Sequence, residues 1–188
     1  MKHILLISLL FVAACKDFDI EHTITCDSTG AASWRLHILE LPDAKCYQDP
    51  ETCESDVLDF IKILEEAGGT NIEIIHINTE PPFEYIITAY YEELEEILIV
   101  LAEDEPEMFV ESITDGLRIQ LWEEGTLPNA GRIAAVDKGF IPVKLVALGG
   151  DVSLKDHEPK RLVNVGSLGD LHGLRLTWKE PKDLEDKH

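Results

Sequence analysis

The chain has 188 residues, of which 16 are Lys or Arg and 37 are Asp or Glu, giving a formal net charge of −21. Hydrophobic residues make up 45% and charged residues 28%, which is typical of a folded globular protein and excludes an acidic disordered tail. The charge also excludes nucleic acid as an expected partner, since phosphate binding needs clustered Lys and Arg. An acidic surface is likewise repelled by anionic membranes.

The N-terminal residues have the pattern of a bacterial export signal. Lys2 supplies a positive charge, an apolar run follows over residues 4–12, and the small residues Ala13 and Ala14 precede Cys15. A membrane-spanning helix needs about 20 apolar residues, so this run is too short for a stable span. The pattern therefore predicts a signal peptide that is removed after Ala14.

The sequence Val12-Ala13-Ala14-Cys15 resembles the lipobox of bacterial lipoproteins. The resemblance implies diacylglycerol on the thiol of Cys15 and acylation, such as palmitate, on its new amine. Two or three acyl chains anchor a protein stably. We therefore expect a lipoprotein of the bacterial cell envelope, and Lys16 favours the outer membrane, facing the periplasm, in a Gram-negative organism. An ordinary signal peptide or a buried first strand is the alternative.

Export places the remaining cysteines in an oxidising compartment, where disulfides persist. Cys46 and Cys53 flank a short polar segment, and we favour a disulfide between them. Cys26 falls on the apolar side of an expected strand, which favours a buried free thiol. Pairing of Cys26 with Cys46 or Cys53 is the alternative.

The first folded element is a predicted β-hairpin over residues 19–39. Ile24 and Trp34 lie on the apolar sides of its two strands, which flank the turn Asp27-Ser28-Thr29-Gly30. A left-handed glycine at the end of this turn gives a bulged register that sets Ile24 opposite Trp34. A two-residue loop would set Trp34 against Thr23 and divide the apolar residues between the two faces, so the bulged register is favoured.

Two helices and a second strand pair follow. Apolar residues at helical spacing predict helices over residues 55–67 and 92–102, and Gly68-Gly69 ends the first of them. Strands are predicted over residues 71–78 and 83–90, because both are rich in β-branched and aromatic residues. Acidic residues at the start of the second helix are favourable there because they complement its dipole.

The rest of the chain alternates between strands and turns. An acidic segment at residues 103–107 favours a solvated turn; calcium binding is the alternative, although the regular Asp-x-Asp-x-Asp-Gly loop is absent. Further strands are expected at residues 109–114, 117–122, 133–136, 140–148, 152–155, 162–165 and 174–178.

The element order ββ-α-ββ-α, followed by antiparallel strands, predicts an α+β fold. We expect an antiparallel sheet or partly closed barrel with two packed helices. Residues 1–14 are the signal, residues 15–18 the lipidated cysteine and a short tether, residues 19–180 a single globular domain, and residues 181–188 a polar tail.

Several of these features together resemble the LppM-type bacterial lipoprotein domain. They are the lipobox cysteine, the Asp27-Ser28-Thr29-Gly30 turn, a helix ending in Gly-Gly and a Phe-led strand entering an acidic, leucine-containing segment at residues 83–94. The resemblance spans residues 15–122 and implies an α+β domain on a lipid anchor that handles envelope lipids. It implies no catalytic residue. The chain differs from some relatives by its loop at residues 46–53 and by lacking their C-terminal transmembrane helix.

No residue pattern indicates catalysis. The sequence contains no nucleophile elbow, zinc-binding His-Glu-x-x-His helix, phosphate loop or dinucleotide-binding glycine cluster. His22 lies on the apolar side of the first hairpin, where a hydrogen-bonded core or boundary histidine is expected, and His37 lies on the opposite side. We therefore expect no enzyme, metal or cofactor. An envelope hydrolase that uses a pair of acidic residues is the alternative.

The function expected from these features is a non-enzymatic binding module held on the membrane by its lipid. The ligand would be an envelope lipid bound between helices and sheet, or a protein partner bound through an edge strand. A continuous apolar pocket would favour the lipid, whereas a filled core with an exposed apolar patch would favour a protein. A purely structural assembly lipoprotein is a further alternative.

Replacing Cys15 with Ala should abolish lipid labelling and membrane retention, because the thiol is the proposed attachment point. Metabolic labelling with a fatty-acid analogue, followed by membrane fractionation, tests this expectation. Unchanged fractionation of C15A would contradict the lipid anchor.

Overall fold

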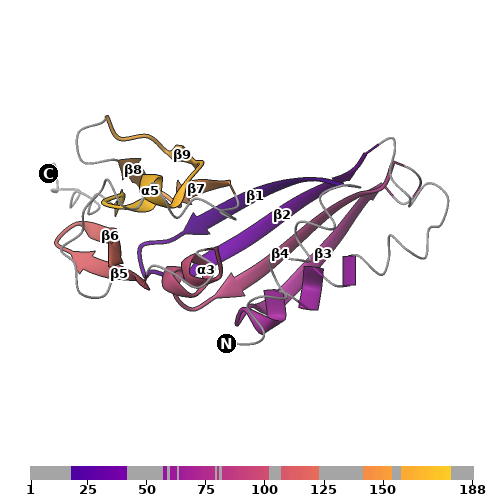
Figure 1. Ribbon diagram of the computed structural model, residues 1–188, viewed down its shortest axis with the longest axis horizontal. Coiled ribbons are helices and arrows are strands. Elements are labelled where there is room, and N and C mark those ends of the chain that lie inside the picture. The colour runs from indigo at the N-terminus through magenta and orange to yellow at the C-terminus, as the bar shows by residue number, and fades with distance from the viewer. Residues whose placement is uncertain are drawn as a thin grey trace, which may run out of the picture.

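A computed structural model of the chain has an α+β architecture in which strands predominate (Figure 1). It describes residues 18–41, 57–58, 60–62, 64–78, 80, 82–101, 107–122, 142–153 and 158–178. The expected signal, the strand at 133–136, most of the acidic segment at 103–107 and the polar tail lie outside these ranges.

Within the described residues, the strands form one sheet of six strands and one of four. The larger sheet contains β1 (Phe18–Cys26), β2 (Ala32–Glu40), β3 (Thr70–Asn78), β4 (Glu84–Tyr91), β7 (Val143–Ala147) and β9 (Leu162–Val165). The smaller sheet contains β5 (Glu107–Ile113), β6 (Gly116–Trp122), β8 (Asp151–Ser153) and β10 (Arg175–Thr177). The helices with full bounds are α3 (Leu94–Leu101) and α5 (Leu168–Leu171).

The strand order of the larger sheet is β3-β4-β2-β1-β7-β9, which leaves β3 and β9 at its edges. Neighbouring strands are antiparallel except β1 and β7, which are parallel. The smaller sheet is antiparallel, with the order β5-β6-β10-β8. We expected one antiparallel sheet or a partly closed barrel; the described strands instead form two sheets. The reason is that β7 pairs beside β1, whereas the β5–β6 hairpin pairs with β10.

The β1–β2 hairpin has the predicted register. Ile24 pairs with Trp34, and His22 pairs with Leu36. Gly30 has φ = 95°, a left-handed conformation that glycine adopts without the steric cost of a Cβ atom. The turn is closed by hydrogen bonds from Gly30 N to Asp27 O at 3.2 Å and from Asp27 N to Ala31 O at 3.0 Å. The bulged register is therefore confirmed.

One face of the larger sheet is buried and the other is open. Successive side chains of a strand point to opposite faces. On β2, Trp34 and Leu36 are fully buried, whereas Arg35 and Leu39 are exposed. The same alternation runs along β4, whose register pairs Ala89 with Trp34. The buried face is the one that the helices cover, and α3 lies in front of β2 and β4 in Figure 1.

Two helical segments supply the cover. The described residues within 57–66 are helical, inside the range predicted at 55–67, and α3 lies within the range predicted at 92–102. Both place an apolar stripe into the core, which includes Val57, Phe60, Leu64, Leu94, Ile97, Leu98 and Leu101. In addition, the Glu95 carboxylate accepts a 2.9 Å hydrogen bond from Val110 N, which joins α3 to β5.

The smaller sheet packs into the same core, since Ile119, Val152 and Leu176 belong to one buried cluster with the larger sheet. A close approach between β6 and β10 requires a glycine at position 116. A Cβ atom there would lie 1.9 Å from the Leu176 carbonyl oxygen, so no other residue fits without moving β10.

No helix in the described part of the chain is long and apolar enough to cross a membrane.

Replacing Trp34 with Ala should lower the free energy of unfolding by ~3 kcal/mol or more, because its side chain is fully buried beneath the helices. Chemical denaturation measures the change. The matched control is Arg35→Ala on the open face, which should change stability by less than about 0.5 kcal/mol. Equal effects of the two substitutions would contradict the assignment of faces.

Candidate functional site

Three of the predicted site residues lie outside the described residues: the lipidation residue Cys15 and the candidate disulfide partners Cys46 and Cys53. Cys26 is described, and its thiol is free and fully buried on β1. Burial raises the pKa of this thiol to about 12. Because the thiolate is the reactive form, Cys26 is not suited to act as a nucleophile at neutral pH. The expectation of a buried free thiol is confirmed.

His22 lies on the buried face of β1 and is only 5% exposed. Its Nδ1 accepts a 3.3 Å hydrogen bond from Trp34 Nε1, so it is the hydrogen-bonded core histidine that the sequence predicted. Burial lowers the pKa of His22 to about 4. The imidazole is therefore neutral at physiological pH, and its Nδ1 is already used as an acceptor.

The other described histidines do not converge on one place. His37 lies on the open face, with its Nε2 2.7 Å from Glu84 Oε1. His76 packs edge-on against Tyr85, with ring centroids 5.1 Å apart. His172 lies at the end of α5. Among the residues that the structure describes, no group of three or more His, Cys, Asp or Glu is placed to hold a metal ion.

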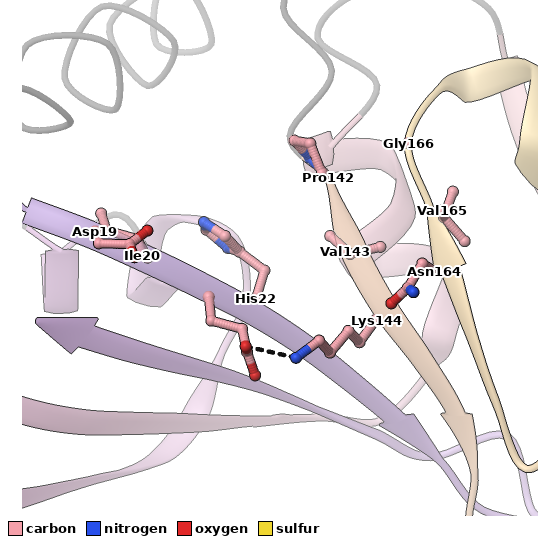
Figure 2. A pocket seen from close by; sticks show the side chains of 10 residues that line it. Asp19, Ile20, His22, Pro142, Val143, Lys144, Asn164, Val165 and Gly166 are labelled. Atoms are coloured by element: carbon pink, nitrogen blue, oxygen red, sulfur yellow. Dashed lines mark ion pairs between the residues drawn. The ribbon is translucent and has the colours of Figure 1, made fainter.

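A pocket of about 360 Å³ opens where β7 begins beside β1 (Figure 2). The β1–β7 register starts with His22 opposite Val143, so the first residues of β1 extend past the start of β7. Ten residues line the pocket: Asp19, Ile20, Glu21, His22, Pro142, Val143, Lys144, Asn164, Val165 and Gly166. Its volume is near the lower end of the range for small-molecule sites.

Two of the three charged side chains that line this pocket, Glu21 and Lys144, form an ion pair, and the third is Asp19. Lys144 Nζ lies 2.5 Å from Glu21 Oε2, the ion pair drawn as a dashed line in Figure 2. The hydrogen bond from Lys144 lowers the pKa of the Glu21 carboxyl. Because Glu21 and Lys144 pair with each other, neither of these two side chains is free to bind a ligand of opposite charge. The pocket therefore has the size for a small molecule, and Asp19 is the charged side chain of its lining outside this ion pair.

The edge strand β3 is the most unusual surface of the described molecule. Ile74, Ile75 and Ile77 are 41%, 54% and 49% exposed, and we call these three side chains the isoleucine edge. Ile74 pairs with Ile87, which is fully buried, yet Ile74 itself is exposed at the edge of the sheet. Long, exposed, hydrophobic edge strands are rare because they offer a template for pairing with another chain.

The open face continues the isoleucine edge with further apolar side chains. Ile75 pairs with the half-buried Ile86 of β4, and Ile86 pairs with His37 of β2. Leu39 and Tyr90, exposed at 38% and 40%, lie on the same face. Apolar side chains on β3, β4 and β2 therefore share the open face with polar ones, which include the His37–Glu84 pair. Exposed apolar side chains framed by polar ones are typical of interaction sites.

Exposed acidic side chains lie before and after β3 in the chain, and the open face also carries the exposed Arg35 of β2. Glu65 and Glu66 are exposed at the end of the helical segment before β3, and Glu80 is exposed after it. Glu73 is the single acidic residue within β3, which also contains His76. Its carboxylate accepts a 3.5 Å hydrogen bond from the Tyr90 hydroxyl. Among the described residues, Glu73 takes part in no ion pair.

The sequence predicted β3 as a strand but not its exposure. The consecutive apolar residues Ile74 and Ile75 are typical of a strand buried on both faces. Here the opposite holds, because β3 is an edge strand and most of its side chains are exposed. The buried Glu40 was also missed: its Oε2 accepts a 2.8 Å hydrogen bond from Phe83 N. The sequence pattern that indicates this burial is the position of Glu40 on the same side of β2 as Ile38.

Comparisons with known proteins supply no family. No protein-family model matches the chain. No curated protein is found to match it, and no solved structure is similar to it. The residues and their geometry are therefore the basis for inferring function.

The free energy of unfolding should fall as pH drops from about 6.5 to about 4. In this window an unfolded histidine binds a proton, whereas His22 in the folded protein, with its pKa lowered to about 4, does not. The loss from His22 should reach about 3 kcal/mol at pH 4. Urea denaturation across this pH range measures it.

His22→Gln is the control, because glutamine keeps a polar group without titrating. The pH dependence of H22Q should be much weaker between pH 6.5 and 4. Burial lowers the pKa of His172 as well, and its contribution is the same in both proteins. Identical pH profiles for the two proteins would contradict the burial of a neutral His22.

Proposed function

We propose that the protein is a lipid-anchored, non-enzymatic binding module of the bacterial envelope that holds a protein partner against β3. The observation that carries the proposal is the exposure of Ile74, Ile75 and Ile77 on a strand with no further neighbour in the described sheet. The outer edge of such a strand presents N–H and C=O groups to which a partner chain can hydrogen bond. Binding a partner would bury the isoleucine edge.

The interior supports a protein partner over a lipid. Trp34, Ile87, Leu94 and Leu98 are at most 1% exposed where the helices meet the sheet, so this layer is filled by side chains. The pocket at the start of β7 borders this layer at His22, which accepts a hydrogen bond from Trp34, and its lining includes the Glu21–Lys144 ion pair. The resemblance to LppM-type domains favours lipid handling. The filled interior is our reason for placing a protein partner first.

The proposed anchor would hold one end of the larger sheet near the bilayer. Residues 16 and 17 separate Cys15 from the start of β1, and an extended residue spans at most ~3.6 Å. The lipidated cysteine would therefore lie within roughly 11 Å of Phe18. Asp19, Leu39, Glu84 and Asn78 form one cross-strand row at this end of the sheet. An edge strand held close to the membrane would meet partners embedded in the same membrane.

A photo-cross-linking amino acid in place of Tyr90, next to the isoleucine edge, should form an adduct with a discrete protein in living cells. Ile75→Lys in the same protein should reduce the adduct about tenfold, because a charge would then lie in the proposed interface. Ile75 is exposed, so its substitution should leave the melting temperature nearly unchanged. Immunoblotting of the irradiated cells measures the adduct.

The matched control is Ile99→Lys. Ile99 is 50% exposed but lies on α3, away from β3, so the adduct should persist. Equal loss in both variants, or an adduct formed with lipid alone, would contradict a protein interface at β3.

A further inference from the structure

We propose that the partner contributes a basic β-strand that pairs antiparallel with β3, with Lys or Arg opposite Glu73 and apolar side chains opposite Ile74 and Ile75. This inference rests on the proposed function and adds the chemistry of the partner segment. It also fixes the position of that segment along β3.

The regular part of β3 defines where a strand can be added. Glu73, Ile74, Ile75 and His76 pair in unbroken succession with residues 88, 87, 86 and 85 of β4. The register shifts before Glu73 and after His76. Bulges twist and bend a strand and disturb further pairing. An added strand would therefore align with residues 73–76, where the edge is regular.

The two faces of β3 determine the side chains that the partner needs. Glu73 and Ile75 share the open face, since they pair with Thr88 and Ile86, whereas Ile74 shares the helix-covered face with Ile87. Residues opposite each other in a sheet lie on the same face and interact directly. Apolar partners opposite Ile74 and Ile75 would cover both exposed isoleucines. A cation opposite Glu73 would provide the ion pair that this carboxylate lacks among the described residues.

The charge of the molecule favours a basic partner over a second copy of the chain. Glu65 and Glu66 are exposed before β3 in the chain and Glu80 is exposed after it, and the formal charge of the whole chain is −21. Two copies would bring these acidic surfaces together, and like charges across a contact are unfavourable. Anionic lipid would be repelled in the same way. A partner strand that carries Lys or Arg would be attracted by the same negative charge.

The test uses the full-length protein in nonionic detergent and synthetic peptides with blocked ends. The first peptide has threonine, isoleucine, isoleucine, lysine and threonine in that order, so that its lysine meets Glu73 in antiparallel pairing. The second has glutamate in place of the lysine. The third is the first peptide with its alternate backbone nitrogens methylated, which removes the donors for strand addition. Peptide affinity and amide hydrogen exchange are the measurements.

We expect the lysine peptide to bind about fivefold more tightly than the glutamate peptide and to slow exchange at residues 73–76. The Glu73→Lys protein should reverse this preference, and the methylated peptide should not bind. Higher salt should weaken binding of the lysine peptide. A reversed preference can be observed only if both the wild-type protein and the Glu73→Lys protein are folded. It therefore distinguishes loss of charge pairing from damage to the fold.

Three outcomes would overturn the inference. They are equal affinity for the lysine and glutamate peptides, protection of β3 by phosphatidylglycerol vesicles instead of peptide, and self-association of the protein that Ile75→Lys removes. Loss of the cellular adduct in Ile75→Lys would uphold the proposed function even if the peptides failed. Failure of the inference about a basic partner strand is therefore distinguishable from failure of the proposed protein interface at β3.

Discussion

The register of the β1–β2 hairpin is the constraint on which the rest of the molecule depends. It sets Ile24 against Trp34 and places both on the buried face, beneath the helices. A slip by one residue would turn every side chain of a strand to the opposite face. The same register extends through β4 to β3, so it also determines which face stays open. The apolar surface next to β3 is thus a consequence of how the core is built.

An exposed edge strand is a liability that proteins usually limit by charge, proline, bulges or a covering element. β3 has register shifts near both ends and one acidic residue, Glu73, but its centre stays regular and apolar. Three exposed isoleucines add little to the core of the isolated protein. If β3 pairs with a partner strand, the interface would bury them. The proposed lipid anchor would favour pairing with such a partner by confining the molecule to the membrane surface, where a membrane partner is concentrated.

Local patterns predicted much of the fold. The hairpin register, the helical stripes and the burial of His22 all follow from residue spacing and turn chemistry. The parallel pairing of β7 with β1 does not, because apolar periodicity indicates that a strand exists without naming its neighbour. For the same reason, the sequence pattern did not predict the exposure of β3. Ile74-Ile75 fits a strand with two buried faces as well as an edge strand with two exposed ones, and long-range packing decides between them.

The most direct test of the proposed interface is amide hydrogen exchange at β3 in two settings. In one, the protein is purified in nonionic detergent; in the other, it remains in membranes isolated from its host. If a partner strand pairs with β3, its amides should exchange rapidly in the purified protein and slowly in the membranes. The central strand β2 should exchange slowly in both, because it is paired on both sides. Equally rapid exchange of β3 in both settings would contradict the account.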